Sequence, residues 1–171
     1  MSTEKIVVSV FAKDRPGILS DLSSAVLAQK ANWLHSSLSR LCGQFSGLAQ
    51  FEVSIEQKDA LLAAFSELAE RGIQVSVQNA DGFAPDTAEI EGVQLLVETN
   101  DREGIIEELT GALDDASINV DQIDTEVETN DGRDVFRAHL FVVLPEDVSQ
   151  QDLEALFTDL ADDLTISILD E

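Results

Sequence analysis

Apolar and polar positions alternate along the first half of the chain in a pattern that predicts regular elements. Residues 6–12 are apolar and rich in β-branched side chains, which is typical of a buried strand, and the polar segment from Asp14 to Gly17 ends it. Apolar residues then recur at three- and four-residue spacings, which predicts a helix after Gly17. The expected core face of this helix comprises Ile18, Leu22, Val26 and Leu27.

The remaining elements of the first half follow from the same kind of pattern. In order, they are a strand over residues 33–41, a turn over 43–47, a strand over 48–55, a helix over 58–70 and a strand over 73–77. Gly72 is expected to end the second helix, and the two middle strands to pair as an antiparallel hairpin. This order predicts a ferredoxin-like unit, a four-stranded antiparallel sheet with both helices on one face.

A short motif occurs twice. The segment Asp14-Arg15-Pro16-Gly17-Ile18 returns as Asp101-Arg102-Glu103-Gly104-Ile105, and Asn32 returns as Asn119, both at a spacing of 87 residues. Residues 61–68 resemble residues 153–160 at a spacing of 92, so the second copy carries about five extra residues between these landmarks. Such a match predicts two similar units in tandem.

The second half repeats the order of elements. They are a strand over residues 93–98, a helix over 105–115, strands over 118–128 and 135–144, a helix over 153–164 and a strand over 165–169. The extra residues are expected in the polar turn over 129–134. The predicted fold class is α+β, with one ferredoxin-like domain over residues 1–80, a linker over 81–88 and a second domain over 89–171.

The turn between the first strand and the first helix is the strongest candidate for ligand chemistry. The first amides of a helix have no partner within it, Pro16 suits the first helical position, and Gly17 lets a ligand approach the backbone. A small carboxylate could accept hydrogen bonds from the amides of Gly17 and Ile18. Asp14 could receive the ammonium group of the same molecule, and the side-chain amide of Asn32 offers a donor and an acceptor. Together these groups would recognise an α-amino acid.

Each of these residues also has a plain structural explanation. Asp14 could cap the helix, Pro16 and Gly17 could shape the turn, and Asn32 could end a helix in the left-handed conformation. The combination, in the same order and present twice, favours a ligand site in the first repeat.

The second repeat is a weaker candidate. Glu103 stands where the first repeat has Pro16, which places a carboxylate where an anionic group would have to bind. This copy therefore serves structure or binds something else. Its candidate residues are Asp101, Arg102, Gly104, Ile105 and Asn119.

The chain is strongly acidic, with a net charge of −24. Residues 1–80 hold 8 acidic and 7 basic side chains, whereas residues 81–171 hold 26 acidic and 3 basic. A field of that sign repels phosphate backbones, so direct nucleic-acid binding is not expected. Trp33 and Phe51 are accordingly expected in a core or an interface rather than in a base-stacking platform. The acidity suits either solubility in a saline cytoplasm or a surface that binds a basic protein.

Other kinds of site find little support. His35 and His139 are the only histidines and lack a nucleophile or a carboxylate at a diagnostic spacing, so catalysis is not expected. The acidic segments 121–124 and 130–134 do not match a calcium loop, and no metal site is expected. Residues 43–47 lack the lysine of a nucleotide-binding loop, and no cofactor is expected.

The sequence favours a cytoplasmic protein without membrane contact. Cys42 is the only cysteine, which excludes an intrachain disulfide bond. No apolar run approaches the roughly 20 residues that span a bilayer, and no signal-peptide pattern precedes the first strand.

The motif Asp14 to Ile18 between a first strand and a first helix, with Asn32 at the start of the next strand, resembles the ACT domain, a ferredoxin-like small-molecule sensor. The resemblance covers nearly the whole chain. Two such repeats most resemble the glycine cleavage system transcriptional repressor family and related tandem ACT proteins. The ACT resemblance implies that paired units bind an amino acid between them, with the turn from Asp14 through Arg15 to Ile18 of one unit facing the region around Asn32 of another.

The resulting hypothesis is a regulatory protein that binds a small amino acid, glycine or serine being favoured. The repressor resemblance implies that it acts through a partner transcriptional regulator, without contact between this chain and DNA. The units are expected to pair within one chain or in a homo-oligomer. The competing hypothesis is a ligand-independent interaction protein whose units pair through exposed sheet edges.

Overall fold

The structure is a computed structural model that describes residues 2–78, 92–158 and 164–169. The chain divides into two compact units, Met1–Pro85 and Asp86–Glu171. The linker expected over residues 81–88 lies outside the described residues, so the exact domain bounds stay a prediction.

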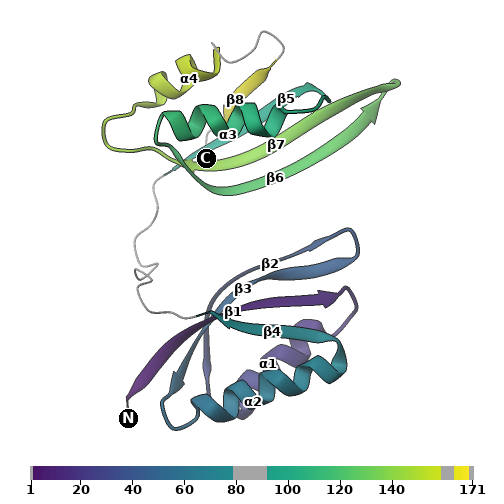
Figure 1. Cartoon of the computed structure of the whole chain (residues 1–171), viewed down its shortest axis with the longest axis vertical. Helices are drawn as coiled ribbons and strands as arrows, with labels where there is room; N and C mark the ends of the chain where they lie inside the picture. The colour runs from purple at the N-terminus through teal and green to yellow at the C-terminus, as the bar shows by residue number, and fades with distance from the viewer. Residues whose placement is uncertain (1, 79–91, 159–163, 170–171) are drawn as a thin grey trace. The chain divides into compact units, whose positions relative to one another are not determined.

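The first unit contains a four-stranded antiparallel sheet with the strand order β2-β3-β1-β4. Helices α1 and α2 cover one face of this sheet and leave the other face open (Figure 1). The elements are β1 (Thr3–Lys13), α1 (Ile18–Ala28), β2 (Asn32–Leu41), β3 (Gln44–Ser54), α2 (Lys58–Leu68), the short 3₁₀ helix η1 (Ala69–Arg71) and β4 (Ile73–Gln78).

The second unit repeats this topology, with the strand order β6-β7-β5-β8. Its elements are β5 (Val93–Asn100), α3 (Ile105–Asp115), β6 (Asn119–Asn130), β7 (Arg133–Val143), α4 (Gln150–Thr158) and β8 (Thr165–Leu169). The expected class, α+β with two tandem ferredoxin-like units, is therefore confirmed. The end of the last predicted helix, residues 159–163, lies outside the described residues.

Each core forms between the helices and alternate residues of the sheet. In the first unit, Ile18, Leu22 and Val26 of α1 are buried against β1 and β3, as their spacing predicts. Leu27 is the exception, because 76% of it is exposed. A helix turns about 100° per residue, so Leu27 is rotated away from the stripe that Val26 completes. The assignment of Leu27 to the core is therefore wrong.

The first hairpin turns more tightly than expected. The predicted turn over residues 43–47 is wrong, because β2 ends at Leu41 and β3 begins at Gln44, which leaves only Cys42 and Gly43 in the turn. Gly47 lies inside β3 opposite Leu38, with φ of 151°. A β-carbon at Gly47 would lie 2.0 Å from the carbonyl oxygen of Ser37. The glycine therefore permits a close approach of β2 to β3.

The second hairpin also turns on two residues, Asp131 and Gly132, rather than on the predicted segment 129–134. The extra residues of this repeat are instead divided between two places. β6 has 12 residues where β2 has 10, and residues 144–149 join β7 to α4 where residues 55–57 serve in the first unit. Hydrogen bonding between the strands thus continues through most of the polar segment.

A Gly47→Ala variant should destabilise the first unit by about 2 kcal/mol or more, because the methyl group would collide with the backbone of β2. The matched control is Gly111→Ala in α3, where the added methyl group meets no atom within 4 Å and helix propensity should add roughly 0.5–1 kcal/mol. Urea unfolding of both variants measures the two changes. Equal stability of Gly47→Ala and the parent protein would contradict this account of the hairpin.

Helix α4 begins with a reciprocal cap. The amide of Asp152 donates to Ser149 Oγ (3.2 Å), while Asp152 Oδ2 accepts from the amide (2.9 Å) and the hydroxyl (2.5 Å) of Ser149. The hydrogen bonds from the Ser149 hydroxyl and amide lower the pKa of the Asp152 carboxyl group. The bonds that the Asp152 carboxylate accepts therefore stabilise the folded state more when Asp152 is ionised.

Because the folded-state pKa of Asp152 is lowered, its contribution should be complete above the ordinary aspartate pKa of about 3.9 and should vanish as the pH falls through the folded-state value. The difference in unfolding free energy between the parent protein and Asp152→Ala should accordingly be present at pH 7 and shrink in acid. Ser149→Ala should cost about 1 kcal/mol at pH 7. A pH-independent difference for Asp152→Ala would argue against this cap.

Candidate functional site

The repeated motif forms the turn that leads from a strand into a helix. Gly17 is the N-cap of α1 with φ of 93°, and Gly104 is the N-cap of α3 with φ of 90°. Both glycines adopt the left-handed conformation that other residues enter at a cost. The first bond within α1 runs from the amide of Asp21 to the carbonyl oxygen of Gly17 (2.8 Å), so the amides before Asp21 have no partner inside the helix.

Two local expectations need correction. Pro16 does not occupy the first helical position, because the helix begins at Ile18 and Gly17 is its cap. Pro16 instead fixes the backbone of the turn just before the cap. The structural explanation offered for Asp14, that its side chain caps the helix, is also wrong, since no side chain makes a capping hydrogen bond to α1. The left-handed residue after α1 is Lys30, with φ of 56°, and Asn32 begins β2.

Asp14 is anchored by its backbone and keeps an accessible carboxylate. Its amide donates to the carbonyl oxygen of Gly43 in the hairpin turn (2.9 Å), and the Asp101 amide makes the equivalent bond to Asp134 (2.8 Å). One third of the Asp14 side chain is exposed, and Arg40 Nε lies 3.8 Å from its Oδ2. At that distance the ion pair is loose, so the carboxylate can also accept an ammonium group.

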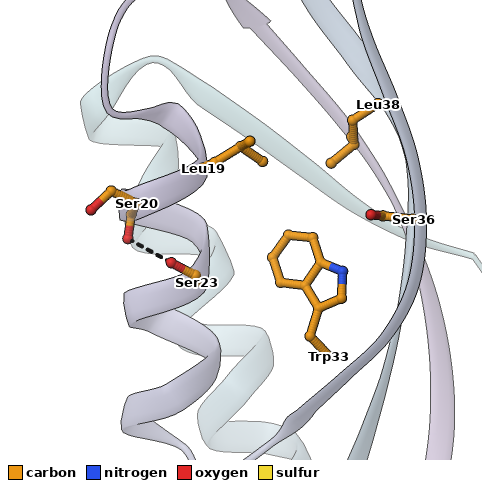
Figure 2. Close-up of a pocket in the computed structure, with 6 residues that line it drawn as sticks. All are labelled: Leu19, Ser20, Ser23, Trp33, Ser36 and Leu38. Carbon is orange, nitrogen blue, oxygen red and sulfur yellow. Dashed lines mark hydrogen bonds between the residues drawn. The ribbon is translucent and has the colours of Figure 1, made fainter.

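Next to the helix start lies a groove between α1 and β2, here called the α1–β2 groove. It has a volume of about 550 Å³, and Figure 2 shows Leu19 and Leu38 pointing toward each other across it, with the Trp33 ring between helix and strand. Its lining residues are Leu19, Ser20, Ser23, Trp33, Ser36 and Leu38. The groove therefore combines apolar walls with the hydroxyl group of Ser36, whereas Ser23 donates its hydroxyl to the carbonyl oxygen of Ser20 (3.2 Å) and the Ser20 hydroxyl points away (Figure 2).

A β-bulge shapes this groove. The pairing of β2 with β3 shifts between Trp33 and His35, so Trp33 and Ser36 both face the helices although three positions separate them. Trp33 packs edge-on against buried Phe51, with ring centroids 5.0 Å apart, which confirms the core or interface position expected for both. Sequence alternation could not reveal the groove, because a bulge reverses the alternation without leaving a clear mark in the sequence.

Asn32 lies at the far end of the same unit from the turn. It pairs with Glu52, and Glu52 pairs with Lys5 near the start of β1, whereas the turn follows Lys13 at the end of β1. The eight residues from Lys5 to Lys13 span about 26 Å at the usual rise of a strand. One unit therefore does not bring Asn32 to its own turn.

The first turn is balanced slightly toward positive charge. Arg15 Nη2 lies 2.9 Å from Asp21 Oδ2, and Arg71 Nη2 lies 2.5 Å from Asp21 Oδ1. With Arg40 beside Asp14, three guanidinium groups face two carboxylates, a formal charge of +1. This balance, together with the free amides of the helix start, favours an anionic group.

The second turn has the opposite charge. Arg102 donates to both carboxylate oxygens of Glu108 (2.8 and 2.6 Å), and Asp101, Glu103 and Glu107 add further acids, a formal charge of −3 for these five residues. The corresponding cavity has a volume of about 670 Å³. Its lining residues are Asp101, Arg102, Gly104, Ile105, Ile106, Glu107, Thr110, Val127 and Phe136, and Asn119 is not among them.

Within residues 2–78, 92–158 and 164–169, no group of three or more histidine, cysteine, aspartate or glutamate side chains could hold a metal ion. In the same part of the chain, no helix has the length and apolar character needed to cross a membrane.

The chain is similar to one protein family and to several solved structures. Residues 4–78 match the family model of the ACT domain, whose members are regulatory amino-acid-binding domains. No curated protein sequence matches the chain significantly. An unknown protein from Galdieria sulphuraria has a similar crystal structure, with 27% sequence identity, a TM-score of 0.76 and coverage of 99% of this chain and 100% of that one.

A second crystal structure, of a protein provisionally described as a glycine cleavage system transcriptional repressor, matches 100% of both chains with 16% identity and a TM-score of 0.72. At that identity the likeness establishes the shared fold. The protein is therefore a tandem ACT-like chain, in which residues 4–78 form an ACT domain and the second unit repeats the ACT-like fold.

Proposed function

We propose that this protein is a non-catalytic, cytoplasmic regulator that binds a small amino acid at its first unit and thereby changes its contact with a transcriptional regulator. Glycine and serine are the favoured ligands. The observation that carries the proposal is the contrast between the two turns, because only the first combines free helix-start amides, an accessible Asp14 and a positive charge balance. The second turn would repel a carboxylate.

In this proposal the ligand carboxylate accepts from the amides near Gly17 and Ile18, and its ammonium group pairs with Asp14. The side chain of serine would point into the α1–β2 groove, which begins at Leu19 and Ser20 in the first turn of the helix, whereas glycine would leave the groove empty. The hydroxyl group of Ser36, which faces the groove in Figure 2, suits a small polar side chain. Because Asn32 lies about 26 Å along the sheet from its own turn, the asparagine that completes the site belongs to another ACT unit.

The asparagines of the two repeats provide a matched test. Asn32→Ala should weaken binding of glycine or serine by roughly 1–3 kcal/mol, since a polar group of the ligand would lose its partner. Asn119→Ala removes the equivalent side chain of the acidic repeat: it should leave the affinity unchanged where two first units pair, whereas the loss would move from Asn32→Ala to Asn119→Ala where the two repeats of one chain pair. Isothermal titration calorimetry with the common amino acids measures both. Equal binding by Asn32→Ala and the parent protein would remove Asn32 from the site.

A second test transfers the charge of the second turn to the first. Ser20 corresponds to Glu107, and Ser20→Glu places a carboxylate in the first turn of α1, where it favours the helix but opposes an anionic ligand. Binding should weaken by about tenfold or more, while thermal stability is maintained. Ser24→Glu, which adds the same charge to α1 at an exposed residue that is not among those lining the groove, serves as the control. Undiminished affinity in Ser20→Glu would place the carboxylate elsewhere.

The alternative is a ligand-independent interaction protein, and the edge position of β2 and β6 in their sheets favours it. Under that alternative, calorimetry would detect no amino acid, and substitutions in the first turn would leave partner binding unchanged. Ser37→Lys, which places a charge on this exposed edge strand, would then be the change that disrupts association.

A further inference from the structure

Arg15 is not directed at the space above the helix start. Its guanidinium group is held by a closed set of contacts, here called the clasp, formed by Arg15, Asp21 and Arg71. Arg15 Nη2 donates to Asp21 Oδ2 (2.9 Å) and to the carbonyl oxygen of Arg71 (3.1 Å), while Arg71 Nη2 donates to Asp21 Oδ1 (2.5 Å). Each oxygen of the Asp21 carboxylate is therefore occupied by a different arginine.

The clasp joins three parts of the unit. Asp21 lies in the first turn of α1, Arg15 lies in the motif turn, and Arg71 ends η1 just before left-handed Gly72. Asp21 is only 12% exposed, so its two charged hydrogen bonds are better shielded from water than those of a surface ion pair.

The same arrangement occurs in the second unit, although the acid differs. Arg102 folds back onto Glu108, which corresponds to Asp21 at the spacing of 87 residues. An arginine of the motif turn that pairs with an acid six residues later is thus common to both repeats. Among the described residues, only the first repeat has a second arginine on this acid, Arg71, which lies at the end of its second helical segment.

We propose that Asp21 is a positioning residue of the first-unit ligand site, and that Arg15 shapes this site without touching the ligand. The proposal rests on the proposed amino-acid binding and deepens it. Arg15 Nη1 donates to the carbonyl oxygen of Pro16 (3.2 Å) and lies 3.6 Å from where a β-carbon of Gly17 would be. The clasp therefore fixes the peptide group that leads into the helix start.

Loss of Asp21 would release the flexible guanidinium group of Arg15, which follows Asp14 directly in the motif turn. Pairing between Arg15 and Asp14 would then compete with the ligand ammonium group for the same oxygens. It would also free the peptide between Pro16 and Gly17, so the amides would lose their preset orientation.

The test compares Asp21→Asn, which removes the charge, with Asp21→Glu, which copies the acid of the second unit. Glycine and serine serve as probes in calorimetry, and amide hydrogen exchange at residues 17–21 is measured without ligand. Asp21→Asn should raise the exchange rates in this segment and weaken probe binding by about tenfold or more. Asp21→Glu should restore both to within about threefold of the parent protein.

The control is Glu4→Gln, which removes the carboxylate partner of Lys58 (2.6 Å) elsewhere in the same unit and should change neither readout. If Asp21→Asn exchanges and binds as the parent protein does, the clasp has no positioning role. If Asp21→Glu fails to restore binding, a fold defect is the cause and the proposal is also overturned. If neither probe binds even the parent protein, the proposed function fails, while a rise in exchange in Asp21→Asn, reversed in Asp21→Glu, still supports the clasp as the device that fixes the turn.

Discussion

The direction of the chain through each unit decides which groups can meet. β1 carries the chain to the motif turn, α1 carries it back across the sheet, and β2 therefore begins at the end of the sheet where β1 began. A helix of 11 residues rises about 16 Å, which is too far for one small ligand to touch both ends. Any site that uses both the turn and Asn32 must be shared between units.

The two repeats show how a duplicated scaffold can keep its geometry and change its chemistry. The left-handed glycine cap, the backbone bond from the motif aspartate and the folded-back arginine are present in both units. Glu103 and Glu107 replace Pro16 and Ser20 and add two negative charges around the helix start, while the positive balance of the first turn also depends on Arg40 and Arg71. The backbone of the turn is therefore independent of its ligand preference, because the glycine and the arginine pair determine its shape.

Most of the fold could be predicted because the patterns that specify it are local. The bounds of α3 and β8 match the predicted segments 105–115 and 165–169, where hydrophobic periodicity is regular and a turn lies close by. The hairpins were less predictable, since Gly47 looks like a turn residue but serves a close approach between strands. Polar residues 129 and 130 likewise look like a loop, yet backbone pairing with β7 continues through them.

The clasp could not be predicted from the sequence, for a different reason. Arg15 and Arg71 are 56 residues apart, and only the packing of η1 beside the motif turn brings them to the same carboxylate. The α1–β2 groove also could not be predicted, because it depends on a β-bulge that no residue type in the sequence indicates. Single residues such as Asp14 and Gly17 could be predicted as candidates, whereas the orientation of their neighbours required the three-dimensional structure.

A shared site has a thermodynamic consequence for regulation. A ligand shifts an equilibrium only by its difference in affinity for the two states, and a site completed by a second unit has that difference built in. In the proposed site, the unpaired unit would offer the turn amides and Asp14 and the paired arrangement would add an asparagine, so the ligand would favour pairing by the free energy of the added contact. Linkage makes the effect reciprocal, because whatever stabilises pairing, including a bound regulator, must raise the affinity for the amino acid by the same factor. A contact worth roughly 1–3 kcal/mol corresponds to a shift of about 5- to 150-fold, which is the usual range of allosteric coupling.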